Sequence, residues 1–224
     1  MGNKMKVLIL SGYDDAMKEV GDRCTATHRR YAERHGYDCE VVRHYRPDTH
    51  PSHQKIRLIQ ERIDQYDRIM WLDADSVVMD YRMRIEDWFG VDCIMDISVD
   101  WCAPPEDDGG DGPWATTYVS CGNFIIANTP DTHRFLDTWA KHSERYSKRQ
   151  VCCWEQDGLR SAMQADKWFD SKVKRWHRCT LNAVHPTCVN RNFPDRAPKP
   201  YEPGDFFLHL TNVDRIAILN DLGL

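Results

Sequence analysis

Short apolar runs alternate with longer segments of helical periodicity in the N-terminal half of this chain. The apolar run Lys6 to Leu10 precedes a polar segment with helical spacing, 15–35, and Cys39 to Tyr45 is the next strand candidate. Isoleucines then mark one face of a helix that ends near Gln65, and an apolar strand follows at 68–72. Alternating strands and helices form right-handed crossovers on a mostly parallel sheet. We therefore predict an α/β fold with a Rossmann-like, mostly parallel central sheet flanked by helices.

The C-terminal half adds three strand candidates, Cys93 to Val99, Tyr118 to Ala127 and Phe206 to Leu210. Thr129-Pro130 has the form of a helix cap followed by a first-turn proline. The Pro-, Gly- and Asp-rich stretch 104–113 has nothing to bury and is typical of a loop. Since neither an internal repeat nor a long linker is evident, we expect one domain over the 224 residues.

Charge and hydropathy exclude several classes of function. The net charge of −5 gives no indication of nucleic-acid binding, and the densest basic stretch, at 28–35, is typical of the solvated side of a helix. The apolar run near the N-terminus is too short to span a membrane. Nine cysteines occur without Cys-x-x-Cys spacing, which is typical of free thiols in a reducing compartment. We expect a cytoplasmic protein with no integral membrane segment and no nucleic-acid partner.

Two aspartates, Asp73 and Asp75, directly follow the apolar strand at 68–72. Ligands of open α/β sheets bind at the carboxyl ends of the strands. Placing two carboxylates there is costly unless a cation or hydrogen-bond donors compensate them, and hard oxygen ligands select Mg²⁺ or Mn²⁺. The alternative is a solvent-exposed turn whose aspartates cap a helix.

Four segments in order resemble a known group of proteins. They are His53-Gln54-Lys55 with the strand 66–75, then Cys121-Gly122-Asn123-Phe124-Ile125-Ile126-Ala127-Asn128, then Glu155-Gln156-Asp157-Gly158-Leu159, and finally His209-Leu210-Thr211-Asn212. Together they resemble GT-A-fold glycosyltransferases, and in particular the galactosyl- and xylosyltransferase family of yeast mannan-type α-galactosyltransferases and plant xyloglucan xylosyltransferases. From the sequence we expect no membrane anchor of the kind that the family's Golgi members carry. The chain also has Thr211-Asn212 where a Gly-containing tail usually follows the late His.

The resemblance implies a metal site and a nucleotide-sugar donor, a UDP-sugar in our reading. Asp75 would ligate Mn²⁺ or Mg²⁺, Asp73 would reach the metal or the donor, and His209 would be the third protein ligand. A single His in a strand is alternatively a core residue with satisfied hydrogen bonds. Lys55 would place a positive charge on the diphosphate, with a solvent-facing helix lysine as its alternative.

Further donor contacts are expected at Ser11, Gly12 and Tyr13, where Tyr13 would stack on the base, although a plain strand-to-helix turn has the same sequence. Asn123 beside Gly122 is a candidate contact to a sugar hydroxyl.

Glu155, Gln156 and Asp157 are the candidate catalytic residues. If the reaction inverts the anomeric centre, a carboxylate must take the proton of the acceptor hydroxyl, with Asp157 the first choice and Glu155 the second. If configuration is retained, as in the family named above, Gln156 would steady the sugar while the leaving phosphate accepts the proton. The alternative is an acidic first turn that complements a helix dipole. Asp96 and Asp100 are further candidates for the cleft wall.

We therefore expect a metal-dependent glycosyltransferase acting on a glycan or glycoconjugate acceptor, with a nucleotide-binding half at about 1–100 and an acceptor half at about 101–224. A metal-dependent nucleotidyltransferase or phosphohydrolase is the enzyme alternative, and an inactive sugar-binding relative is the non-enzyme alternative.

Overall fold

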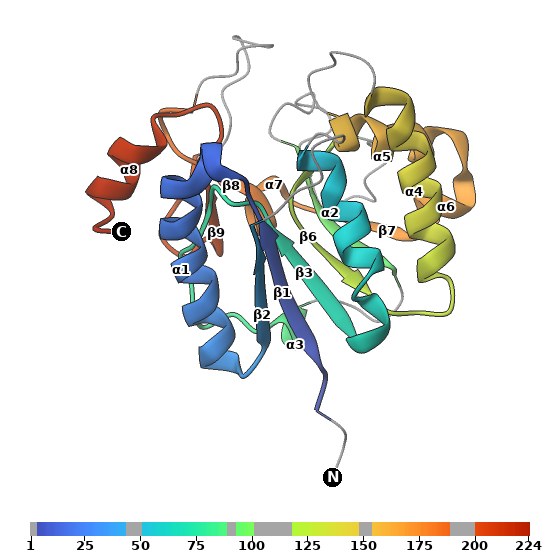
Figure 1. The fold of residues 1–224 in the computed structure, drawn as a ribbon, viewed down its shortest axis with the longest axis horizontal. Coiled ribbons are helices and arrows are strands. Elements are labelled where there is room, and N and C mark those ends of the chain that lie inside the picture. The colour runs from blue at the N-terminus through green and yellow to red at the C-terminus, as the bar shows by residue number, and fades with distance from the viewer. Residues whose placement is uncertain (1–3, 44–50, 89–92, 101–117, 148–153, 189–199) are drawn as a thin grey trace.

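A computed structural model describes residues 4–43, 51–88, 93–100, 118–147, 154–188 and 200–224 (Figure 1). The predicted loop at 104–113 lies outside these residues. The strands are β1 (Val7–Gly12), β2 (Asp38–Val42), β3 (Arg68–Leu72), β4 (Ser76–Val78), β5 (Met95–Val99), β6 (Val119–Ala127), β7 (Val173–Trp176), β8 (Ala183–Val184) and β9 (Phe207–His209). The helices are α1 (Lys18–His35), α2 (Pro51–Gln60), α3 (Ile85–Trp88), α4 (Thr132–Ser147), α5 (Trp154–Ala165), α6 (Lys167–Ser171), α7 (Arg178–Asn182) and α8 (Arg215–Asp221), with 3₁₀ turns at Asp15–Met17 and Ile63–Gln65.

The central sheet has the strand order β2-β1-β3-β6-β5-β7. The pairs β1–β2, β1–β3 and β5–β7 are parallel, whereas β6 runs antiparallel to both of its neighbours. The prediction of a mostly parallel α/β sheet is confirmed. The carboxyl ends of β1, β3 and β5 share one edge of this sheet, and the amino end of β6 lies among them.

Both faces of the sheet are covered, as Figure 1 shows. Along β1, Leu8 and Leu10 join the core on the side of α2, α4 and α5, while Val7 and Ile9 join the core on the side of α1. Strands buried on both faces are continuously apolar, which explains the uninterrupted apolar run from Val7 to Leu10. Trp139 of α4 is fully buried.

Helix α1 ends where its sequence predicted. Gly36 adopts the left-handed conformation with φ of 68°, and its backbone N–H reaches the carbonyls of the last helical turn. A residue without a Cβ takes this conformation at little cost, so the chain can turn at once into β2.

A second, smaller sheet of order β4-β9-β8 lies beside the first. Strand β4 pairs with β9 in antiparallel fashion, with Ser76 opposite His209, and β8 pairs with β9 in parallel. Its apolar side chains pack with α1 and α8 in a core that includes Val77, Leu208 and Leu219. The C-terminal strand predicted at 206–210 therefore exists, but it belongs to this small sheet.

Three local predictions need correction. Helix α2 ends at Gln60, and a 3₁₀ turn replaces its predicted last turn. Helix α4 begins at Thr132, whose hydroxyl accepts a hydrogen bond from the backbone N–H of Thr129 at 2.8 Å. Asp96 does not line a cleft, because it is buried within β5 and accepts a hydrogen bond from the indole N–H of Trp176 at 2.9 Å.

The cysteines that the structure describes with their side chains, Cys24, Cys39, Cys93, Cys121 and Cys188, are free thiols. Within the same part of the chain, no helix has the length and apolar character needed to cross a membrane.

Candidate metal centre and active site

The segment Asp73 to Asp75 forms a tight turn that links the central sheet to the small one. The backbone N–H of Asp73 bonds the carbonyl of Gly122 on β6 at 2.8 Å, and the N–H of Ser76 closes the turn on the carbonyl of Asp73 at 3.0 Å. The carbonyl of Asp75 accepts from the N–H of Leu210, just beyond β9, at 2.8 Å. Three segments of the chain therefore hold the backbone of this turn.

The Asp73 carboxylate is oriented by two donors from the central sheet side. Its Oδ1 accepts from the indole Nε1 of Trp71 at 2.6 Å and from Nζ of Lys55 at 3.0 Å. The side chain keeps 29 % of its surface exposed, so one side of the carboxylate still faces the outside of the protein. This is the geometry of a carboxylate that is positioned and still open to a ligand.

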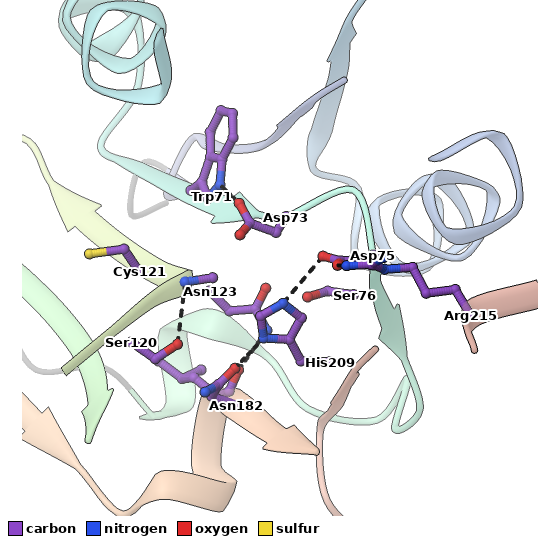
Figure 2. A network of polar contacts seen from close by, with 12 residues as sticks. Trp71, Asp73, Asp75, Ser76, Ser120, Cys121, Asn123, Asn182, His209 and Arg215 are labelled. Atoms are coloured by element: carbon purple, nitrogen blue, oxygen red, sulfur yellow. Dashed lines mark hydrogen bonds and ion pairs between the residues drawn. The ribbon is translucent and has the colours of Figure 1, made fainter. Parts of the chain in front are cut away.

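The Asp75 carboxylate lies between two basic side chains. Its Oδ1 is 3.2 Å from Nε2 of His209, and its Oδ2 accepts from Arg215 of α8 at 3.0 and 2.8 Å (Figure 2). Burial alone would raise the pKa of Asp75, but His209 and Arg215 hold it well below its usual range. The carboxylate therefore stays ionised despite being buried.

His209 reaches the turn from β9 with both ring nitrogens in contact. Nδ1 is 2.7 Å from the amide Oδ1 of Asn182, and Nε2 faces Asp75. Burial would lower the pKa of His209, but the Asp75 carboxylate raises it above its usual value. The ring packs against β6, where a Cβ on Gly122 would lie 2.6 Å from Cε1 of His209. Only glycine leaves room for the ring at this place.

The side chains of Asp73, Asp75 and His209 each offer a ligand atom, and these atoms lie within 4.8 Å of one another. Two carboxylates and an imidazole are a donor set that suits a divalent cation such as Mn²⁺ or Mg²⁺. The residues present therefore fit a divalent metal ion, and the predicted triad is brought together.

Lys55 is not the solvent-facing lysine of the alternative reading, because it is 2 % exposed. Its Nζ contacts Asp73 at 3.0 Å, Glu155 at 2.7 Å and the carbonyl of Cys121 at 2.8 Å. Burial alone would lower the pKa of Lys55, but the two carboxylates raise it. The three donors of the ammonium group are therefore all engaged within the protein.

The three candidate catalytic residues begin α5 and lie in different surroundings. Glu155 is buried against Lys55, and burial raises the pKa of its carboxyl group against the opposing effect of that lysine. Gln156 accepts from the N–H of Cys121 at 3.0 Å and donates to Asp100 at 2.6 Å. These contacts tie both residues to the edge of β6 that carries the metal centre.

Asp157 lies one position further along α5. It is 23 % exposed, and its carboxylate lies 3.5 Å from the guanidinium of Arg160. Its assignment as the first-choice base stays a prediction.

The predicted nucleoside contacts at the end of β1 are placed as follows. Ser11 is buried in the strand, and the Tyr13 ring is 4 % exposed, with Arg43 lying 4.3 Å from its centroid on one face. On the other face, a Cβ on Gly21 would lie 2.6 Å from the ring, and the Tyr13 hydroxyl donates to Asp22 at 2.6 Å. A base that stacks on Tyr13 would therefore have to displace Arg43.

Asn123 lies on β6 next to Gly122 and is fully buried. Its Nδ2 donates to the carbonyl of Leu181 at 2.7 Å. In this arrangement its Nδ2 stabilises the end of α7. A contact of Asn123 with a sugar hydroxyl stays a prediction.

Sequence reasoning missed Asn182, Arg215 and Trp71 as members of this centre. Arg215 and Asp75 are 140 positions apart, and Asn182 and His209 are 27 apart. Trp71 alone carried a local signal, because residues two apart on a strand share a face and its indole reaches Asp73.

The sheet order, with the aspartates at the end of β3 and the histidine on β9, gives this chain the GT-A fold. Residues 3–96 match the model of the galactosyl transferase GMA12/MNN10 family, which confirms the predicted resemblance over this part of the chain. A search of curated proteins finds no match.

Solved structures with this fold include several glycosyltransferases. One is involved in glycosylation of the major capsid of PBCV-1, with a TM-score of 0.67 and 13 % identity over 97 % of this chain and 98 % of the other. Mouse xyloside xylosyltransferase 1 has a TM-score of 0.54 and 11 % identity, over 92 % of this chain and 98 % of the other. The galactosyltransferase LgtC, solved with donor and acceptor sugar analogs, has a TM-score of 0.51 and 15 % identity, over 91 % of this chain and 87 % of the other. At these identities the likeness establishes the fold alone.

Proposed function

We propose that this protein is a glycosyltransferase that moves a sugar from a nucleotide-sugar donor, a UDP-sugar, to a hydroxyl group of a glycan or glycoconjugate acceptor. The observation that carries the proposal is the convergence of Asp73, Asp75 and His209 within 4.8 Å at the carboxyl end of β3. In an open α/β sheet this edge is where ligands bind, and a diphosphate is a ligand that a metal ion can hold there.

Asp73, Asp75 and His209 would hold the cation, Mn²⁺ or Mg²⁺. When bound, it supplies Lewis-acid stabilisation of the negative charge that develops on the departing nucleoside diphosphate.

Two basic side chains would support the same charge from the protein. Arg215 lies beside Asp75 with 34 % of its side chain exposed, so its guanidinium can contact an anion without leaving its partner. Lys55 is buried and would act on the donor through Asp73, whose Oδ1 it holds at 3.0 Å. This role differs from the direct phosphate contact expected from the sequence.

In the transfer, the bond between the anomeric carbon and the phosphate oxygen breaks, and a new bond to the acceptor oxygen forms. If the reaction is inverting, the proton of the acceptor hydroxyl passes to Asp157, or to Glu155 as the second choice. If it is retaining, the leaving phosphate oxygen takes that proton and Gln156 steadies the sugar.

The nucleoside would lie against Ser11, Gly12 and Tyr13 at the end of β1, with Arg43 displaced from the Tyr13 ring. Asn123 would contact the sugar through its Oδ1, which has no hydrogen-bond partner within the described residues, while its Nδ2 stays bonded to Leu181. We also propose that residues 1–224 act as one unit, in which about 1–100 bind the nucleotide and about 101–224 bind the acceptor.

Thermal unfolding with UDP- and GDP-sugars, each with and without Mn²⁺, tests the proposal. We expect a rise in melting temperature that needs both the matching donor and the metal, and its loss in Asp75→Asn. Asp64→Asn is the matched control, since this aspartate has 72 % of its side chain exposed and pairs only with a surface histidine in the described residues. If no nucleotide with metal stabilises the protein, the proposed function is wrong.

Product analysis separates this function from the alternatives. A glycosyltransferase releases a nucleoside diphosphate and lengthens the acceptor by one sugar. Release of pyrophosphate or inorganic phosphate would instead identify a nucleotidyltransferase or phosphohydrolase, and metal-independent binding without turnover would identify an inactive sugar-binding relative.

A further inference from the structure

Asn182 lies directly behind the imidazole of His209, on the side away from Asp75 (Figure 2). It is the last residue of α7 and is 2 % exposed. Its Oδ1 is 2.7 Å from Nδ1 of His209. Within the described residues, its own Nδ2 is buried with no hydrogen-bond partner. A buried donor without a partner is destabilising, so stability alone does not favour an asparagine here.

The position of Asn182 relative to His209 is fixed by the surrounding backbone. The N–H of Leu181 bonds Oγ of Ser98 at 2.9 Å, and its carbonyl accepts from Asn123 at 2.7 Å. Directly after Asn182, β8 pairs with β9, with Val184 opposite His209. The hydrogen bonds of Leu181 and the pairing of β8 with β9 therefore fix where the Asn182 side chain lies relative to His209.

An amide oxygen only accepts hydrogen bonds, so Nδ1 of His209 must carry the hydrogen of this contact. In the neutral imidazole, the form that binds a metal, the lone pair is then on Nε2, the nitrogen that faces Asp75. Metal-binding histidines commonly donate their other N–H to an oxygen, which fixes the tautomer and the ring orientation.

We propose that Asn182 is the positioning residue that presents Nε2 of His209 to a divalent cation. This inference rests on the proposed metal site. Removing such a partner typically weakens metal binding about 10- to 100-fold.

The test uses Mn²⁺ as the probe, with its dissociation constant measured by isothermal titration calorimetry. We expect Asn182→Leu, which removes the acceptor at similar volume, to weaken Mn²⁺ binding about 10- to 100-fold. Asn182→Asp restores an acceptor and should recover most of the affinity. Asn128→Leu is the matched control, because it removes hydrogen bonds to the carbonyls of Ile63 and Tyr66 at the opposite end of β6.

The EPR spectrum of bound Mn²⁺ separates positioning from general destabilisation. Wild type should show nitrogen hyperfine coupling from a histidine ligand, and Asn182→Leu should weaken or lose it at saturating Mn²⁺. Unchanged affinity and unchanged coupling in Asn182→Leu would overturn the inference while the metal site stands. If wild type binds no Mn²⁺ even with the donor, the proposed function itself fails.

Discussion

The buried ammonium of Lys55 lies between two carboxylates. Its removal should lower the free energy of unfolding by an amount that depends on pH. Lys55→Met keeps the volume of the side chain and deletes the charge between Asp73 and Glu155. Asp73 retains 29 % exposure and can be solvated, whereas the Glu155 side chain is 7 % exposed and is left as an uncompensated buried charge. Breaking a buried pair in this way costs about 3–5 kcal/mol.

The titration of Glu155 gives a second estimate of the stability lost in Lys55→Met. Without Lys55, the buried carboxyl group can become neutral by taking a proton. From an ordinary pKa of 4.5, protonation at pH 7 costs about 3 kcal/mol, and at pH 5 it costs below about 1 kcal/mol. A carboxyl group whose pKa is raised on folding gains relative stability as pH falls. The deficit of the variant should therefore shrink from about 3 kcal/mol at pH 7 to about 1 kcal/mol at pH 5.

Urea unfolding followed by circular dichroism at the two pH values measures this difference. Lys55→Met/Glu155→Gln should recover most of the loss at pH 7, because no charge is then buried alone. Lys18→Met is the control, since its partner Asp22 is exposed and such pairs contribute about 0–1 kcal/mol. A deficit below about 1 kcal/mol at pH 7, or one that is equal at both pH values, would refute this account of Lys55.

Three further substitutions test close contacts and a buried histidine. Gly122→Ala brings a Cβ to 2.6 Å from the His209 ring, so we expect weaker Mn²⁺ binding by calorimetry with near-native circular dichroism. Gly158→Ala places a Cβ 2.5 Å from Cα of Ser143, and we expect a loss of about 1–3 kcal/mol in urea unfolding despite the better helix propensity of alanine. Burial lowers the pKa of His28 from 6.5 to about 4, so wild type should lose about 3 kcal/mol of stability between pH 7 and pH 4 through this group. His28→Gln, in urea unfolding at the two pH values, should show a drop smaller by that amount.

Each of these predictions has a contrary outcome. Unchanged Mn²⁺ affinity in Gly122→Ala would mean that the ring can move without cost. A more stable Gly158→Ala would mean that α4 and α5 separate freely. The exposed His133 serves as control for the pH experiment, and an equal effect of His133→Gln would show that burial of His28 is not the cause.

The sequence predicted those parts of the fold and site that short-range patterns determine. After Arg68, the strand at 68–72 is continuously apolar because both of its faces are buried, and this assignment places Asp73 and Asp75 at its carboxyl end. The end of α1 could also be predicted, because Gly36 takes a conformation that few other residues tolerate.

The parts that could not be predicted depend on contacts between distant segments. Nothing in 206–210 distinguishes a strand of the central sheet from one that pairs with β4. The burial of Lys55 follows from the packing of α2 against α5 and β6, which helical periodicity does not report. Asn182 was overlooked because a buried amide becomes informative only when its neighbour, here His209, is known.

The pairing of Ser76 with His209 has a consequence for how the protein folds. The ligands from β3 exist early in the chain, but the third ligand arrives only when β9 docks beside β4. Closing a loop of that length costs about 4 kcal/mol of chain entropy, which the packed interface must offset before a cation can add its own binding energy. A cation bound by all three ligands would therefore stabilise the docking of β9 beside β4. In a proteolysis experiment, Mn²⁺ with donor should protect the C-terminal segment 200–224 more than any other part of the molecule.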